Sequence, residues 1–170
     1  MAAIVSKATG SIILNQQFHD QSATQKHELG LVIPARKGRR FLYLQYGEAV
    51  TRQGSVVAVT GTTFQGLMLT TTIANQGPPW IGVSAYNGAT TSAYYGWIAL
   101  DKQDDGEVDL GIDTLASDAA DIIQYSTATA GAIDDSATTQ IIGVRLSTAT
   151  GGAQAVNYTS AWKNMQAIVY

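Results

Sequence analysis

The sequence predicts an all-β protein, folded as a compact antiparallel β-sandwich or a small β-barrel, with an extended N-terminal arm and at most one short helix. Short runs rich in β-branched and aromatic residues recur along the chain. Glycine, asparagine, aspartate and proline separate these runs, and almost no helical periodicity lies between them. The 170 residues are enough to bury the core of one domain.

The first 26 residues are expected to form the arm, and residues 27–170 a single β-rich domain. The stretch LNQQFHDQSATQK is polar and lacks a steady apolar period. Such a segment has no apolar face that could pack against a core. We therefore expect it to become ordered only against a partner surface, with the few apolar side chains as anchors: Ile12, Ile13, Leu14 and Phe18.

The first clear strand is RFLYLQY, residues 40–46. Its odd-numbered residues Phe41 to Gln45 share one face and its even-numbered residues Leu42 to Tyr46 share the other. Apolar and aromatic residues on both faces are typical of a strand that is covered on both sides. Further strand-like runs follow in this order: GSVVAVT, GLMLTTTIA, WIGVSAY, YYGWIAL, GEVDLGI, TQIIGVRLST and MQAIVY.

Turns and one possible helix complete the pattern. The pairs Asn87-Gly88 and Asp105-Gly106 predict tight hairpin turns, because both residue types tolerate positive φ. In DTLASDAADIIQY, residues 113–125, apolar side chains recur at helical spacing after Asp113, a suitable N-cap. The same residues are compatible with the start of a strand, so both interpretations stay open.

The composition is unusually poor in charge. Charged residues make up 14% of the chain, against about 25% in an average protein, and this favours a component of an assembly. The net charge of −3 argues against general affinity for nucleic acid. The absence of cysteine excludes disulfides, thiolate metal sites and a thiol nucleophile. No apolar run approaches the ~18 residues of a membrane span, and the N-terminus is a poor secretion signal.

Catalytic and metal motifs are missing from the sequence. His19 and His27 lie eight residues apart in a polar segment, where neither is placed beside a nucleophile, and we expect both at the surface or in an interface. The acidic run Asp101–Asp109 resembles a calcium loop only in its sixth residue, Gly106, and is better explained as a solvated hairpin turn. The prediction is a protein that is not an enzyme and holds no metal or cofactor.

The aromatic residues Trp80, Tyr94, Tyr95 and Trp97 allow two interpretations. They can line a platform for sugars or bases, or they can pack in the core and pair across strands. In an all-β chain the second is the commoner use of such residues.

The segment PARKGRR concentrates four cations in five positions: Arg36, Lys37, Arg39 and Arg40. One interpretation is a solvated turn. The other is a contact with carboxylates on another subunit or a neighbouring protein, where arginine can pair bidentately. Nucleic acid is disfavoured, because one isolated patch makes few phosphate contacts.

Three segments together resemble the capsid decoration, or cement, proteins of tailed bacteriophages. They are HELGLVIPARKGRRFLYLQYGEAVTRQGSVVAV, WIGVSAYNGATTSAYYGWIALDKQ and GAIDDSATTQIIGVRLSTATGGAQAVNY. The likeness lies in the order of a Gly-Arg turn, a Phe/Tyr strand, two IGV strands and the marker YYGWI. It covers residues 30–158, most of the chain, and leaves the N-terminal arm unmatched.

The resemblance implies a β-rich structural protein made in the bacterial cytoplasm and located on the outer capsid surface of the virion. It implies the major capsid protein as partner, self-association as a homotrimer, and no contact with nucleic acid or membrane. Two alternatives remain: a carbohydrate-binding head-fibre or adhesin domain, which would use Trp80, Tyr95 and Trp97, and a jelly-roll coat protein of a small virus. A coat protein would favour a basic arm, whereas residues 1–25 carry only Lys7.

Overall fold

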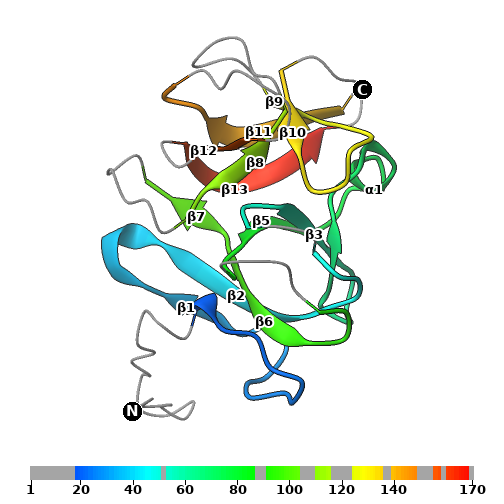
Figure 1. Cartoon of the computed structure of the whole chain (residues 1–170), viewed down its shortest axis with the longest axis vertical. Coiled ribbons are helices and arrows are strands. Elements are labelled where there is room, and N and C mark those ends of the chain that lie inside the picture. The colour runs from blue at the N-terminus through cyan, green and yellow to red at the C-terminus, as the bar shows by residue number, and fades with distance from the viewer. Residues whose placement is uncertain are drawn as a thin grey trace.

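The computed structural model confirms an all-β fold built from a small closed barrel and a second, curled sheet (Figure 1). It describes residues 18–50, 53–86, 91–103, 110–115, 124–135, 139–148, 155–157 and 160–168. The strands, pairings and contacts given below are those of these residues.

The barrel contains five strands and carries a sixth on its side. β2 pairs with β4, β4 with β3, β3 with β5, β5 with β6, and β6 returns to β2. β1 is added to β2 outside this ring, and only the β2–β4 pairing is parallel. The strands are β1 (Val32–Pro34), β2 (Arg40–Tyr46), β3 (Val56–Thr60), β4 (Gln65–Met68), β5 (Trp80–Ser84) and β6 (Tyr95–Ala99).

Alternate residues of the barrel strands fill its interior. In β2 the even-numbered side chains from Leu42 to Tyr46 point inward, and none of them is exposed. Phe41 and Tyr43 point outward and are nevertheless buried. The prediction that this strand is covered on both faces is therefore confirmed. Gly66 leaves room for that filling, since a Cβ there would lie 2.9 Å from Val57 and 3.0 Å from Leu44.

The second sheet has seven strands in the order β12-β8-β10-β9-β11-β13-β7. All its described pairings are antiparallel except β8–β10. A single residue, Leu100, separates β6 of the barrel from β7 of this sheet. The strands are β7 (Asp101–Lys102), β8 (Ile112–Thr114), β9 (Gln124–Ser126), β10 (Ile133–Asp134), β11 (Thr139–Arg145), β12 (Ala155–Asn157) and β13 (Ala161–Ile168).

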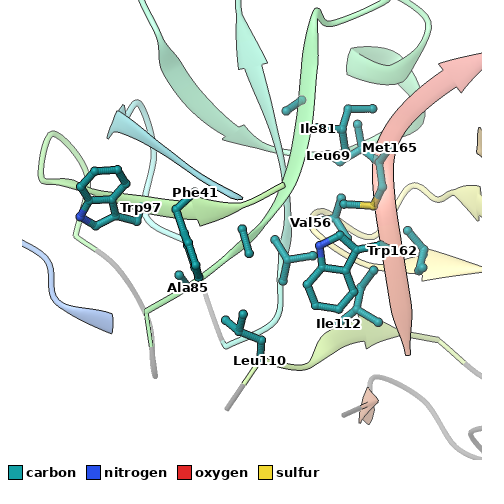
Figure 2. Close-up of a cluster of buried hydrophobic side chains, with 14 of the residues drawn as sticks. Phe41, Val56, Leu69, Ile81, Ala85, Trp97, Leu110, Ile112, Trp162 and Met165 are labelled. Carbon is teal, nitrogen blue, oxygen red and sulfur yellow. The ribbon is translucent and has the colours of Figure 1, made fainter. Parts of the chain in front are cut away.

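One hydrophobic core joins the two sheets. Val56 and Ile81 on the outer wall of the barrel belong to the same buried cluster as Ile112, Trp162 and Met165 of the second sheet (Figure 2). None of these five side chains is more than 3% exposed. Because burial of apolar surface is the main stabilising term, this shared cluster holds the barrel and the second sheet together.

The one α-helix among the described residues lies elsewhere than the sequence suggested. α1 spans Thr71–Ala74, and the hydroxyl of Thr70 accepts a hydrogen bond from the N–H of Ile73 as its N-cap. Asp113 lies within β8 and is not an N-cap, so a helix beginning there is wrong. Residues 124–126 form β9, while residues 116–123 lie outside the described part. The predicted hairpin turns at 87–88 and 105–106 also lie outside it.

Residues 18–26, expected to need a partner, lie against the barrel of their own chain. Phe18 is 2% exposed and stacks on Phe41 at 3.9 Å between ring centroids, with its edge toward Trp97. Ser22 and Tyr95 exchange backbone hydrogen bonds of 2.9 and 2.8 Å. This segment covers the outward aromatic face of β2 and β6, which would otherwise be exposed to water. The prediction of Phe18 as a partner contact is therefore wrong; Ile12, Ile13 and Leu14 lie outside the described residues.

Candidate functional site

The segment with four cations folds as a tight turn before β2. A short 3-10 turn, η2, spans Arg36–Gly38, and Ala35 donates a 2.7 Å hydrogen bond to the carbonyl of Arg39. Lys37 and Gly38 have φ values of 59° and 72°, the left-handed region that glycine tolerates and lysine rarely adopts. The turn leaves Arg36 and Lys37 exposed at its tip.

Arg39 does not reach the surface. Its side chain is 3% exposed, and its guanidinium carbon lies 6.0 Å from the centroid of the Phe41 ring. The residue leads directly into β2, and its side chain extends along the aromatic outer face of that strand. The prediction of Arg39 as a capsid or subunit contact is wrong, because a buried guanidinium cannot meet a partner.

Arg40 is engaged within the chain. Its Nε and Nη2 donate to the two carboxylate oxygens of Asp101, Nη2 at 3.1 Å from Oδ1, and Nη2 also donates to Asn164. The hydrogen bond to Asp101 raises the pKa of Arg40 above its ordinary value. Asp101 begins β7 and Asn164 lies in β13, so Arg40 ties the barrel to the second sheet. Its predicted role as a partner contact stays a prediction: the guanidinium is paired with Asp101 within the chain, but its side chain remains 38% exposed.

A shallow groove lies across three neighbouring strands close to the η2 turn. Its volume is about 340 Å³, and its lining comes from β7, β11 and β13 and the residue after β7: Lys102, Gln103, Gly143, Arg145, Ala161, Trp162 and Lys163. A Cβ added to Gly38 would lie 3.1 Å from Nε2 of Gln103, which places the turn beside the groove.

Basic side chains border this groove. Arg145 and Lys163 are exposed, whereas Lys102 is buried with its ammonium 5.6 Å from the centroid of the Trp162 ring, a cation–π distance. Together with Arg36 and Lys37 of the adjoining turn, these are five of the ten lysines and arginines in the sequence. We call the four exposed ones, Arg36, Lys37, Arg145 and Lys163, the basic face.

A β-bulge shapes the groove. The register of β11 against β13 shifts between Ile142 and Val144, at Gly143. Gly143 has φ 92°, and a Cβ there would lie 2.3 Å from the carbonyl oxygen of Lys163. Such a bulge increases the local twist and redirects the side chains on either side of it. Gly143 stands inside the strand-like run TQIIGVRLST, and an isolated glycine in such a run is the sequence signal for a bulge.

The aromatic platform considered for sugars is not formed. Trp97 is 3% exposed, in line with its alternative role in the core, and Trp80 is 37% exposed in a different hollow. Tyr95 and Trp97 line a hollow of only about 40 Å³, together with residues of the docked segment 20–27. His27 closes over it, 4.9 Å from the Tyr43 ring and 5.2 Å from the Trp97 ring.

Other site types find no support in the part of the chain that the structure describes. No group of three or more histidine, cysteine, aspartate or glutamate residues is placed there to hold a metal ion. No helix there is long and apolar enough to cross a membrane. Comparison with protein-family models, with curated proteins and with solved structures found no match.

Proposed function

We propose that this chain is a structural attachment protein that binds an acidic protein surface through its basic face. The observation that carries the proposal is the gathering of four exposed cations from η2, β11 and β13 around one groove. The chain as a whole has a net charge of −3, so these cations are unevenly distributed. A local patch of one sign steers and orients a partner of the opposite sign.

The partner is a protein and not nucleic acid. Binding to a phosphate backbone gains affinity from each phosphate contact, and four exposed cations on one face of an acidic chain give few such contacts. A protein surface offers isolated carboxylates, with which an exposed arginine such as Arg36 can pair bidentately.

Within this class, we propose a capsid decoration protein that binds the outer surface of a bacteriophage head and bridges subunits of the major capsid protein. The support is the resemblance of residues 30–158 to such proteins, together with the low charge content. A protein that binds only the assembled shell stabilises it by mass action, so modest contacts suffice when several act together.

The test is uptake of the protein by heads assembled without it, taken from the phage that encodes the chain. Arg145→Glu combined with Lys163→Glu should lower occupancy roughly tenfold, because two exposed ion pairs become repulsive. The matched control is Lys26→Glu against Arg145→Glu alone, since both residues are exposed and both changes alter the charge equally. Arg39 and Arg40 are unsuitable targets because their reversal would disrupt the fold.

Two outcomes would contradict the proposal in different ways. Equal weakening by Lys26→Glu and Arg145→Glu would mean that net charge acts and the basic face does not. If the wild-type protein did not bind to the heads, the capsid would be excluded as the partner. Binding to polyglutamate, compared with duplex DNA at the same salt concentration, then tests the basic face separately.

A further inference from the structure

The cations of the basic face are spread across the groove from one border to the other. The sheet order β11-β13-β7 places Arg145 on the first of these strands and Lys163 on the middle one. Beyond β7, the η2 turn with Arg36 and Lys37 lies beside Gln103. An elongated anion lying across the three strands would therefore meet positive charge along its whole length.

Arg145 and Lys163 are diagonal neighbours on one face of the sheet. Arg145 is paired with Ala161, and Lys163 lies two residues further along β13, so its side chain points to the same face as that of Ala161. Diagonal neighbours in such a ladder are about 7–8 Å apart. A carboxylate between the two can therefore contact both. Because a guanidinium has five N–H donors, Arg145 can accept this carboxylate in addition to other acceptors.

Small residues leave space between these cations. Ala161 and Gly143 line the groove without a bulky side chain, and the volume is about 340 Å³. A water molecule takes about 30 Å³, so the groove holds roughly eleven groups of that size. A glutamate residue has fewer non-hydrogen atoms than that and fits within the groove.

The charge of the groove is positive in the part of the chain that the structure describes. No acidic residue is among those that line it there. Asp101, which lies opposite Lys163 in the β7–β13 ladder, is paired with Arg40. Lys102 adds a buried positive charge. The acidic residues between 104 and 109 lie outside the described part. Charge complementarity thus favours an occupant that carries carboxylates.

We propose that the groove binds an extended acidic segment of the partner protein, with one carboxylate between Arg145 and Lys163 and a second at the η2 turn. Neighbouring strands lie about 4.8 Å apart, so the groove spans about 10 Å from β11 to β7. An extended chain covers this distance in about three residues. The inference rests on the proposed attachment to an acidic protein surface, and it specifies a segment that enters the groove.

A nuclear magnetic resonance titration of the isotope-labelled full chain provides the test. The probe is the end-blocked peptide Gly-Glu-Gly-Gly-Glu-Gly, and its control has glutamine in place of both glutamates. The acidic peptide should shift the amide signals of Gly143, Ala161 and Lys163 in a saturable manner, and the glutamine peptide should not. Equal shifts with both peptides, or no shift with either, would overturn the inference.

Ala161→Leu separates entry into the groove from general attraction, because it fills the space and leaves every cation in place. It should abolish saturable binding of the acidic peptide. Gln166→Leu is the matched control, since it places a leucine at an exposed position of the same strand outside the groove. It should leave binding unchanged. Thermal melts check that both variants remain folded.

Lys163→Gln tests the same site without added bulk. It should weaken binding of the peptide by up to about fivefold, because one exposed ion pair is lost. Lys26→Gln removes an exposed cation elsewhere and should have no effect. Equal weakening by the two changes would mean that the peptide responds to net charge alone, which would overturn the inference.

The failure of this inference and the failure of the proposed function give different results. If folded Ala161→Leu bound the peptide and the phage heads as well as the wild type does, the segment in the groove would be excluded and attachment through the basic face would stand. If the wild type bound neither polyglutamate nor the heads, the attachment itself would be excluded, and the inference with it.

Discussion

At the scale of single residues, Tyr46 is a buried polar group with a defined role. Its hydroxyl donates to the carbonyl of Trp97 at 3.0 Å and lies 3.3 Å from the hydroxyl of Ser84. Burial raises its pKa to about 12. An unfolded tyrosine ionises near 10, so the free energy of unfolding should fall as the pH rises from about 10 to about 12.

Tyr46→Phe should therefore lower stability at neutral pH by about 1 kcal/mol, through loss of these hydrogen bonds. It should also reduce the fall in stability above pH 10. Some fall remains, because burial raises the pKa of Tyr43 as well. Urea unfolding at neutral and alkaline pH measures both effects, and an unchanged alkaline slope would show that Tyr46 does not cause it.

Lys37 lies at the tip of η2 with a left-handed backbone. A side chain at φ 59° costs about 1 kcal/mol relative to glycine. Lys37→Gly should raise the free energy of unfolding by up to that amount and weaken attachment to an acidic surface. Lys37→Asn separates the two effects, since asparagine tolerates this backbone region but removes the charge. Loss of stability in the glycine variant would mean that contacts of the lysine side chain outweigh the relief of backbone strain.

At the scale of elements, we expect the docking of residues 18–31 on β2 and β6 to make the stability of the protein depend on pH. His27 packs edge-on against Tyr43. Burial, and secondarily the charge of Lys26, lowers the pKa of His27. The unfolded chain takes up this proton near pH 6.5, before the folded chain does. The contribution of neutral His27 to the free energy of unfolding is therefore fully present above about pH 6.5. It is lost as the pH falls through the lower folded-state pKa.

His27→Phe tests this dependence, because a phenyl ring keeps the aromatic packing and cannot be protonated. The variant should show a smaller loss of stability than the wild type between about pH 7.5 and about pH 5. Urea unfolding at the two pH values gives the comparison. An identical loss in both proteins would assign the acid sensitivity to another group.

The bulge between β11 and β13 depends on Gly143. Gly143→Ala should lower the free energy of unfolding by more than about 2 kcal/mol, because it adds a clash with the carbonyl of Lys163 to an unfavourable φ. Gly77→Ala is the control: its φ of 62° is also left-handed, but nothing lies within 4 Å of the added Cβ. That variant should lose only about 1 kcal/mol. Equal losses would mean that the close approach to Lys163 relaxes freely.

At the scale of the whole molecule, local patterns predicted the fold class and the strand faces. The alternation in β2 is a property of seven consecutive residues, so both of its buried faces could be read directly. The burial of Phe18 could not be predicted from local sequence, because it depends on an aromatic face formed by Phe41 and Trp97, which lie far along the chain. The parallel pairing of β2 with β4 is also set by barrel closure and not by either strand alone.

In the candidate site, too, local sequence predicted some features and only the fold revealed the others. Four clustered cations pointed to the η2 turn, but the sequence could not show that Arg39 is buried and Arg40 is paired with Asp101, 61 residues away. Lys102, Arg145 and Lys163 come from three strands that only the sheet order brings together. The charges could be counted from the sequence, but the surface on which they gather could be identified only from the fold.

The most direct test of the proposed capsid attachment is a cryo-electron microscopy reconstruction of phage heads incubated with this protein. We expect Arg145, Lys163 and the η2 turn to face carboxylates of the major capsid protein in such a reconstruction. A reconstruction with the basic face toward solvent, or one in which the protein is absent from the heads, would contradict it.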